Sequence, residues 1–373
     1  MTLQVREASP GELEDWDARV VDGPHGNVHQ SRAWAAYRAA FGWRPRFLVV
    51  GDGAPILALS RAWPLVRSEG AYLSRGPLPE TDPGTTLARL EAVAGWLAER
   101  GVAVVASDAE VPAESGYPEL LATAGYRRIE ELQPSRHRLA VDLTDVTDPA
   151  ELLSRFSATT RNMIRAAERS DLQIVRYGPP DVLPVGVAEP PAQRPFPTAP
   201  KTDLLAELDV LYGSMRATAV RRGFGLASRD RFLDWSGRAF SAGHLVYVGL
   251  REPGGQLVAG ATFYRHGRRW TYANAADDPR FRKPYPGAVR LVVWEAMKGA
   301  LAEGRTEMDL GGVDVPGARR RPEPGEPAHG MLAFKESFGA SWIELTGAHE
   351  RVFRPTRYAL GRIAARIVAA AGR

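Results

Sequence analysis

Lysine is rare in this sequence of 373 residues, and its scarcity makes each lysine a candidate for a specific role. The chain has 48 basic residues, and subtracting the four lysines leaves 44 arginines. The lysines are Lys201, Lys283, Lys298 and Lys335. Lysine presents a compact ammonium, whereas arginine presents a planar fork of donors, so the two are not interchangeable. A retained Lys335 therefore suggests a site where a compact ammonium matters, against the alternative of a surface lysine at a helix start.

One carboxylate and one pair of glycines follow predicted strands. Asp108 comes directly after the apolar run 102–106. A carboxylate at a strand end could orient an amine or take its proton, or it could simply cap a turn. Gly311 and Gly312 follow the short strand predicted over 307–310, and glycine permits positive φ or close backbone approach. We expect the Asp309-Leu-Gly-Gly stretch to shape a substrate cavity.

A basic stripe is predicted on one helix. Arg161, Arg165 and Arg169 recur at i, i+4 and i+8, so they share a helix face, and Arg155 extends the stripe. Such a stripe suits contact with a nucleic-acid backbone, and a solvated helix face is an equal alternative. The net charge of +4 is small for an RNA-binding protein, so the footprint would be local.

Several classes of chemistry find no support. The absence of cysteine excludes thiol catalysis, Cys-ligated zinc and a thioester intermediate. The seven histidines lack metal-ligand spacing, and there is no P-loop or dinucleotide fingerprint. The coenzyme A loop of ordinary N-acetyltransferases, R/Q-x-x-G-x-G/A, is also missing, since the nearest stretch, 282–288, breaks its spacing. We expect no metal and no cofactor.

The periodicity of the chain indicates the elements that must position these residues. In the first half we predict strands over 47–50 and 102–106, a strand near Leu57, a helix near Trp34 and a helix over 85–100. The segment 178–200 contains eight prolines and is expected to be an extended linker. In the second half we predict helices over 203–221 and 288–303, strands over 244–250, 257–264, 270–274 and 307–310, and a breaker-rich stretch over 315–330. The order of elements recurs loosely, which favours an α/β or α+β fold with a structural duplication.

The two ends of the sequence bear on location. The first residues are acidic, unlike a signal peptide, and no apolar stretch approaches the ~20 residues that span a bilayer. The sequence therefore predicts a cytoplasmic protein. After Glu350 there are six arginines and no acid, with Tyr358, Ile363 and Ile367 at roughly helical spacing. This segment is either a terminal helix docked on its own domain, which we favour, or a basic amphipathic helix on a membrane surface or nucleic acid.

Blocks in a fixed order resemble the Fem family, the aminoacyl-tRNA-dependent peptidyltransferases that build the interpeptide bridge of bacterial peptidoglycan. The most specific blocks are DLGG (309–312) and FKESFG (334–339), in which Phe334 and Phe338 flank Lys335. The weaker blocks are NVHQSRAWAAYRAAFGW (27–43), VAVVASDAE (102–110), QPSRHRLAVDL (133–143), TTRNMIRAAERSDLQIV (159–175) and ATAVRRGF (217–224). The resemblance covers nearly the whole chain.

The resemblance implies a fold of two tandem acetyltransferase-like (GNAT) domains, with the C-terminal segment returning to complete the first. The expected boundaries are 1–150 plus 341–373 for domain 1 and 151–340 for domain 2. The long coiled-coil arm of some members has no counterpart here, so the chain resembles the armless members.

The resemblance also implies a reaction and a set of residues. The reaction is aminolysis of an aminoacyl-tRNA ester by an amine of a peptidoglycan precursor, either lipid II or a UDP-linked muropeptide. Lys335 would stabilise the tetrahedral oxyanion with Phe334 beside it, and Asp108 is a weaker candidate for orienting the amine. Acceptor binding is expected from Trp34, Arg38, Arg221, Gly311 and Gly312. Donor tRNA contacts are expected from Arg161, Arg165 and Arg169.

Three alternatives remain open. The first is a Fem-like enzyme of natural-product assembly that uses the same donor, which the arginine-rich, lysine-poor composition keeps in view. The second is a coenzyme A-dependent N-acyltransferase, which the missing loop disfavours. The third is a non-catalytic module that binds cell-wall precursors. The expected partners are aminoacyl-tRNA and a muropeptide precursor, with peripheral contact at the inner membrane face as a further alternative and no DNA.

Overall fold

The chain forms two compact units, and each is described by itself. In the computed structural model, the described residues are 3–51, 53–133, 136–179, 196–313 and 320–371, with the backbone alone for 369–371. Unit 1 comprises Met1–His137 and Glu344–Arg373, and unit 2 comprises Arg138–Ile343. Most of the proline-rich linker (180–195) and part of the breaker-rich stretch (315–319) lie outside the described residues.

Unit 1 is built on a seven-stranded sheet with the order β1-β2-β3-β4-β5-β14-β6. Only the pair β4 and β5 is parallel among these strands, and its last paired residues are Leu73 and Ser107. The strands are β1 (Val5–Glu7), β2 (Arg44–Val50), β3 (Pro55–Ala62), β4 (Glu69–Leu73), β5 (Val102–Ser107), β6 (Arg127–Arg128) and β14 (His349–Val352).

Unit 2 repeats this arrangement with the order β8-β9-β10-β11-β12-β7-β13. Its parallel pair is β11 and β12, which ends at Thr271 and Asp309, and the other pairs are antiparallel. The strands are β7 (Arg138–Asp142), β8 (Gln173–Tyr177), β9 (Leu245–Arg251), β10 (Leu257–His266), β11 (Arg269–Asp277), β12 (Glu307–Asp309) and β13 (Ser341–Ile343).

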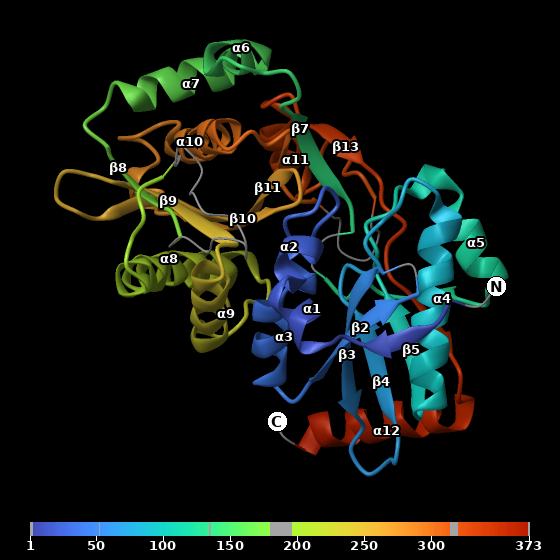
Figure 1. The fold of residues 1–373 in the computed structure, drawn as a ribbon. Coiled ribbons are helices and arrows are strands. Elements are labelled where there is room, and N and C mark those ends of the chain that lie inside the picture. The colour runs from blue at the N-terminus through green and yellow to red at the C-terminus, as the bar shows by residue number, and fades with distance from the viewer. Residues whose placement is uncertain (1–2, 52, 134–135, 180–195, 314–319, 372–373) are drawn as a thin grey trace. The chain divides into compact units, whose positions relative to one another are not determined.

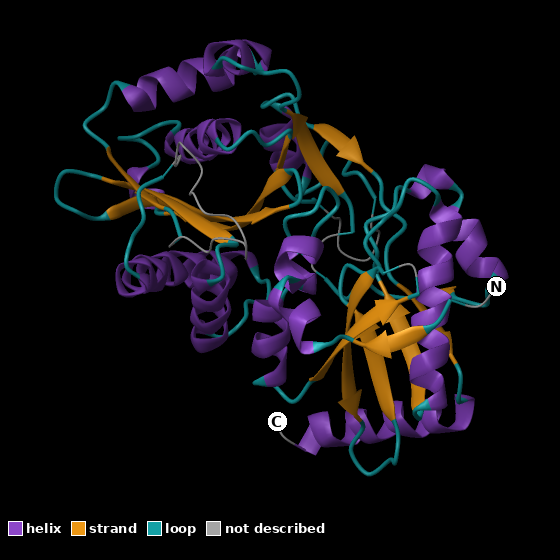
Figure 2. Ribbon diagram, viewed as in Figure 1, coloured by secondary structure: helices purple, strands orange, loops and turns teal. Residues whose placement is uncertain are grey.

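Helices cover the sheet of each unit (Figures 1 and 2). Those of unit 1 are α1 (Pro10–Glu14), α2 (Trp16–Val20), α3 (Arg32–Ala39), α4 (Pro83–Glu99), α5 (Tyr117–Thr123) and α12 (Pro355–Ala371). Those of unit 2 are α6 (Pro149–Arg155), α7 (Ala158–Glu168), α8 (Lys201–Arg222), α9 (Arg229–Ser241), α10 (Ala288–Ala302) and α11 (His329–Glu336). Three short 3₁₀ turns are η1 (Val28–Gln30), η2 (Ala113–Ser115) and η3 (Pro279–Phe281). The helices and strands predicted for the second half are confirmed, with small differences at their ends.

The duplication suspected from the sequence is confirmed strand by strand. In both units four antiparallel strands lead to a helix, α4 or α10, that crosses over to a parallel neighbour. The next position in each sheet is filled by a strand from elsewhere in the chain. In unit 1 this strand is β14, from the C-terminal segment, and in unit 2 it is β7, which precedes the rest of its own sheet.

The bounds of the two units match the expected domain boundaries only approximately. We expected domain 1 to end at residue 150, but β7 pairs with β12 and β13 and therefore belongs to the second sheet. Strand β13 likewise extends unit 2 to Ile343, beyond the expected residue 340. The local sequence of β7 does not specify which of the two sheets the strand joins.

The crossover helices form the centre of each core. Helix α4 begins at Asp82, whose carboxylate accepts the backbone N–H groups of Gly84 and Thr85. It buries Leu90, Val93 and Leu97 against the first sheet. Helix α10 is buried along most of its length, and Trp294 packs edge-on to Phe156 with 5.6 Å between ring centroids. These rigid layers fix the ends of the parallel strands beside them.

The C-terminal helix α12 docks on unit 1, as favoured from the sequence. Tyr358 packs against Trp63 with 6.0 Å between ring centroids, and Ala364 is buried. A Cβ at Gly361 would lie 2.0 Å from Cε3 of Trp63, so glycine permits this close approach. Within the described part of the chain, no helix is both long and apolar enough to cross a bilayer.

Candidate active site

The predicted lysine is buried beside the predicted glycine pair in unit 2. Helix α11 places Lys335 so that only 5% of the residue is exposed. Its Nζ donates a hydrogen bond to the carbonyl oxygen of Gly312 at 3.0 Å. Burying an ammonium is unfavourable unless polar groups surround it, so a buried lysine indicates a position selected for more than packing. The interpretation of Lys335 as a surface residue is wrong.

The glycine turn begins where the parallel pair β11 and β12 stops pairing. Gly311 has φ +71°, a conformation that favours glycine. A Cβ there would stand 3.6 Å from Nζ of Lys335 and 3.5 Å from the carbonyl oxygen of Tyr272. Ligands in α/β sheets commonly bind beyond the carboxyl ends of parallel strands, which is the position of this turn.

Asp309 holds the turn in place. One carboxylate oxygen accepts the N–H of Gly311 at 2.7 Å, and the other accepts the hydroxyl of Thr271 at 3.3 Å. Asp309 is almost fully buried, and Arg269 lies 3.9 Å from its carboxylate. Its charge is thus compensated, and we assign it the task of fixing the backbone on which Lys335 rests.

A second cation, which the sequence did not indicate, lies against the aromatic neighbour of Lys335. Phe334 packs edge-on to Phe338, and the guanidinium of Arg290 lies 5.2 Å from the Phe334 ring centroid. Arg290 also donates to the hydroxyl of Thr160 at 3.2 Å. Partial burial lowers the pKa of Arg290, and no carboxylate among the described residues forms an ion pair with it. An anionic group brought to this place would find a compensating charge.

The arginine stripe predicted on one helix is divided between two, because Arg155 ends α6, whereas Arg161 and Arg165 lie on α7 and Arg169 is its C-cap residue. Arg161 donates to the carbonyl oxygens of Ser154 and Phe156, so it closes the end of α6. Arg155 forms an ion pair with Glu151. Arg165 and Arg169 are exposed, and nothing in the described part of the chain engages either guanidinium. Only the latter two are therefore available for a ligand.

Arg221 lies apart from Lys335 in its contacts. It is exposed in the last turn of α8 and donates to Thr218 at 3.3 Å.

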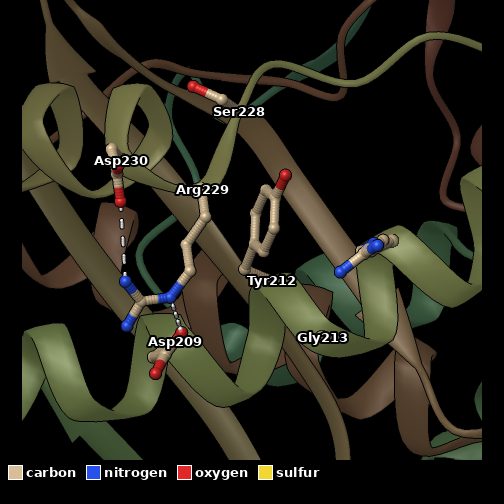
Figure 3. A pocket seen from close by; sticks show the side chains of 7 residues that line it. Asp209, Tyr212, Gly213, Ser228, Arg229 and Asp230 are labelled. Carbon is tan, nitrogen blue, oxygen red and sulfur yellow. Dashed lines mark hydrogen bonds and ion pairs between the residues drawn. The ribbon is translucent and has the colours of Figure 1, made fainter.

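A hollow of about 460 Å³ opens between α8 and α9, lined by residues on both helices (Figure 3). Arg229 in this hollow lies against the carboxylates of Asp209 and Asp230, so its charge is compensated. None of the predicted site residues line it.

In unit 1, Asp108 occupies the place that matches the glycine turn of unit 2. It follows the last pair of β4 and β5 and is 1% exposed. Its carboxylate accepts the hydroxyl of Tyr72 at 2.8 Å and the backbone N–H of Arg75 at 2.6 Å. Burial raises the pKa of Asp108, while the Arg75 guanidinium at 3.6 Å and these hydrogen bonds oppose the rise. These contacts are those of a carboxylate that caps a turn, which is the structural alternative given above. The raised pKa would also suit proton transfer.

The aromatic and basic residues predicted on α3 are brought together. Ser31 caps the helix by accepting the N–H of Trp34 at 3.0 Å. The guanidinium of Arg38 lies 5.2 Å from the Trp34 ring centroid and 4.5 Å from that of Trp43. The guanidinium thus lies close to two indoles, and such cation–π contacts restrict its orientation.

The predicted residues thus fall into separate groups. Lys335, Phe334, Gly311 and Gly312 meet in unit 2, and Trp34 and Arg38 meet in unit 1. Asp108, Arg221 and the α7 arginines have their own surroundings. The residues missed were Arg290, Trp43 and Tyr72. Tyr72 would follow from the sequence only if the pairing of β4 with β5 were known, and nothing in the sequence distinguishes Arg290 from other helical arginines.

Two features bear on metal and coenzyme binding. No three histidine, aspartate or glutamate side chains in the described ranges converge as a metal site requires. The stretch 282–288, where the coenzyme A loop would be expected, leads into α10, and the backbone of Met163 lies against Gly287. Helix α7 therefore lies against Gly287, the residue before α10.

Comparisons with known proteins agree with this architecture. A family model described as an acetyltransferase (GNAT) domain matches residues 197–320. The crystal structure of FemX aligns over 96% of this chain and 99% of its own, with 18% identity and a TM-score of 0.75. A conserved protein of unknown function from Bacteroides thetaiotaomicron aligns over 93% and 98%, with 12% identity and a TM-score of 0.56.

A third structure is the C-terminal domain of a putative lysylphosphatidylglycerol synthetase from Agrobacterium fabrum. It aligns over 96% of both chains, with 16% identity and a TM-score of 0.51. No curated protein matches the sequence. The chain therefore has a tandem GNAT fold of the FemX kind, and the resemblance to the Fem family is confirmed at the level of the fold.

Proposed function

We propose that this tandem GNAT protein transfers an aminoacyl group from aminoacyl-tRNA to an amine of a peptidoglycan precursor. The observation that supports this best is the buried ammonium of Lys335, fixed to the Gly312 carbonyl beyond the parallel strands of unit 2. It occupies the Phe-Lys block that resembles the Fem family, in a chain with the fold of FemX.

The proposed reaction forms one amide and breaks one ester. The acceptor amine attacks the ester carbonyl, and its lone pair becomes the new C–N bond. Negative charge develops on the carbonyl oxygen, and the ammonium of Lys335 stabilises it. The ester C–O bond then breaks, and the ribose oxygen leaves with the proton that the amine has lost. Removing one such oxyanion donor typically costs ~3–4 kcal/mol of transition-state stabilisation.

Contacts with the donor are proposed for cations of unit 2. Arg165 and Arg169 remain candidates for the tRNA backbone because both are exposed and unengaged among the described residues. Arg161 is removed from this role because its guanidinium binds the carbonyls at the end of α6. Arg290 is added, since its charge is partly buried beside Phe334 without a carboxylate partner in the described ranges.

Acceptor binding is proposed for Arg38, oriented by Trp34 and Trp43, and for Arg221. Asp108 is retained as a candidate for orienting an amine through its buried carboxylate. Gly311 and Gly312 are proposed to line the place where the carbonyl reacts. The lysylphosphatidylglycerol synthetase neighbour supports the proposal only in that its name describes attachment of lysine to a lipid.

The coenzyme A alternative is disfavoured by the sequence, because the segment that would contain the coenzyme loop lacks its glycine spacing. In the structure, Met163 of α7 lies against Gly287 in this segment. The natural-product alternative uses the same donor chemistry and differs only in the acceptor, so substrate tests must separate the two.

The deciding experiment is an in vitro transfer assay with a panel of aminoacyl-tRNAs. The acceptors are a UDP-linked muropeptide, lipid II and an unrelated amine. We expect an amide product that disappears after RNase treatment and does not require coenzyme A. Product formed from acyl-coenzyme A without RNA would overturn the proposal. Product formed only with the unrelated amine would favour the natural-product alternative.

A further inference from the structure

We infer that unit 1 has a docking surface for an anionic lipid bilayer, formed by α12 and the adjoining loop between β3 and β4. This surface, the α12 surface, consists of an exposed aliphatic stripe with arginines on either side. Its aliphatic members are Leu65, Leu360, Ile363 and Ile367, and its arginines are Arg67, Arg357, Arg362 and Arg366. The inference stands on this surface alone and does not depend on the proposed reaction.

The outward face of α12 is apolar, and no part of the chain that the structure describes covers it. The helix docks through Tyr358, Gly361 and Ala364, which recur at three-residue spacing. Leu360, Ile363 and Ile367 are 52%, 54% and 59% exposed. Their spacing of three and four residues places them on a single stripe, and the inward face is already occupied. A contiguous apolar stripe on a surface helix commonly marks an interaction site.

Basic residues flank the stripe, and the helix itself contains no acidic residue. At 100° per residue, Arg357 falls on one side of the stripe, and Arg362 and Arg366 fall on the other. All three are exposed, and the sequence from 351 onward has no aspartate or glutamate. Long basic side chains can lay their stems on apolar surface and raise their charged ends to lipid phosphates. An apolar stripe with basic flanks is typical of helices that lie in a membrane interface.

The loop between β3 and β4 continues the same surface. Trp63 at its start packs on Tyr358, and Arg357 donates to the carbonyl oxygen of Arg67 at 3.3 Å. Figure 1 shows this loop projecting beside α12. Leu65 within it has φ +62° and is 93% exposed, the largest exposed fraction among the large hydrophobic residues of the described chain. A leucine held out into solvent by a left-handed backbone is the kind of side chain that inserts among lipids.

An anionic bilayer satisfies both the charge and the apolar stripe. Four large aliphatic side chains contribute nothing to contact with an RNA backbone, which requires cations alone. A second copy of the chain would bring the same arginines together, and like charges would oppose that contact. If the proposed function also holds, this surface favours the lipid-linked acceptor over the soluble one.

The test is co-sedimentation of the full chain with vesicles of phosphatidylcholine alone or mixed with phosphatidylglycerol. We expect binding to the mixed vesicles, little binding to phosphatidylcholine alone, and weaker binding as salt increases. Replacing Ile363→Asp together with Ile367→Asp should weaken binding by about tenfold or more. Arg362→Gln together with Arg366→Gln should weaken binding to the mixed vesicles specifically.

Matched variants control for the change of side chain. Leu120→Asp with Val210→Asp alters exposed aliphatic residues elsewhere, and Arg216→Gln with Arg268→Gln alters exposed arginines elsewhere. Both should bind vesicles like the wild type, and circular dichroism should show that every variant is folded. Equal vesicle binding by the α12 variants and the controls would overturn the inference, as would no binding at all.

Two further outcomes would also overturn it. One is a dimer in sedimentation velocity that the isoleucine variant dissociates, because the stripe would then be a contact between copies. The other is RNA binding lost in the Arg362 and Arg366 variant without any vesicle binding. Since the assay contains no substrate, its failure would leave the proposed reaction untouched, and inactivity in the transfer assay would leave the membrane inference untouched.

Discussion

The Nζ of Lys335 lies 3.0 Å from the carbonyl oxygen of Gly312, which ties helix α11 to the turn after β12. Lys335 as a whole is nearly inaccessible, so the position of its side chain is set by the protein and not by solvent. A cation held in this way needs little rearrangement when a neighbouring oxygen gains negative charge. This contact therefore gives the proposed chemistry a specific test.

Replacing Lys335 with methionine should remove the oxyanion stabiliser while keeping a side chain of similar length. We expect kcat for aminoacyl transfer to fall by about 100–1,000-fold, because one lost oxyanion donor costs ~3–4 kcal/mol. The measurement is transfer of a labelled amino acid from charged tRNA under multiple-turnover conditions with saturating substrates. Lys335→Arg is the matched variant that keeps the charge, and we expect it to recover activity only partly, because the larger guanidinium must displace the Gly312 contact.

Folding must be retained for that result to be informative. Thermal unfolding should show that both variants fold, since methionine fits a partly apolar site beside Phe334. Turnover by Lys335→Met equal to the wild type would remove Lys335 from the catalytic role.

Gly311→Ala tests the turn on which the lysine rests. Gly311 has φ +71°, and a residue with a Cβ there costs about 1–2 kcal/mol. Gly304 is a matched control, because it has φ +70° and a Cβ there would meet nothing within 4 Å. We expect similar losses of stability in urea unfolding for the two alanine variants. Only Gly311→Ala should reduce kcat, since only its methyl group would stand beside Nζ of Lys335.

Equal losses of turnover in the two variants would contradict the proposal that Gly311 positions the ammonium of Lys335. If Gly304→Ala and Gly311→Ala reduced turnover equally, the effect would come from lost stability and not from the position of the ammonium.

Much of the fold follows from the sequence because apolar spacing determines which segments become helices and strands. The helix over 288–303 and the strands around it were predicted because their patterns are local. Which sheet a strand joins cannot be read from its local sequence. Strand β7 pairs with β12, and β14 pairs with β5, through contacts between residues that are distant in the sequence. The predicted boundary at residue 150 was wrong for this reason.

The candidate site shows the same division. Lys335 was identified because lysine is rare and its neighbours form a specific block. The partners of Asp108 were not identified, because Tyr72 meets it only through the register of the parallel pair β4 and β5. Arg290 gave no signal, since the position of its guanidinium on Phe334 depends on how α10 packs beside α11.

The contact of Tyr72 with Asp108 predicts a pH dependence. Burial raises the pKa of Asp108, and the hydrogen bond from Tyr72 opposes that rise. If the carboxylate must be ionised to orient the acceptor amine, kcat/KM falls as the pH drops through this raised pKa. Removing the hydroxyl with Tyr72→Phe should raise that pKa further, so the acid limb of the profile should move to higher pH.

Kinetic profiles between pH 4 and pH 8 would measure this shift. Tyr126→Phe is a matched variant, because it removes another buried phenol hydroxyl of unit 1. Its acid limb should coincide with that of the wild type. An unmoved acid limb in Tyr72→Phe would exclude Asp108 as the group whose ionisation controls activity.

His349 on β14 should make the stability of unit 1 depend on pH. The residue is 7% exposed, and its Nδ1 lies 3.2 Å from the carbonyl oxygen of Gly347. Burial lowers the pKa of His349 and the nearby charge of Arg128 adds to this effect, while the hydrogen bond to Gly347 opposes it. The imidazole therefore stays neutral to a lower pH in the folded state than in the unfolded chain, which takes up a proton near pH ~6.5.

The unfolded state consequently binds more protons below pH ~6.5, so the free energy of unfolding decreases as the pH falls through the lowered pKa. Above pH ~6.5 the contribution of the neutral imidazole is fully present. His349→Gln keeps a hydrogen-bonding side chain that does not titrate, so its urea midpoint should decline less between pH 7.5 and pH 5 than that of the wild type. The same substitution at exposed His25 controls for the loss of a histidine as such. Parallel declines in wild type and His349→Gln would show that burial of this imidazole does not couple folding of unit 1 to pH.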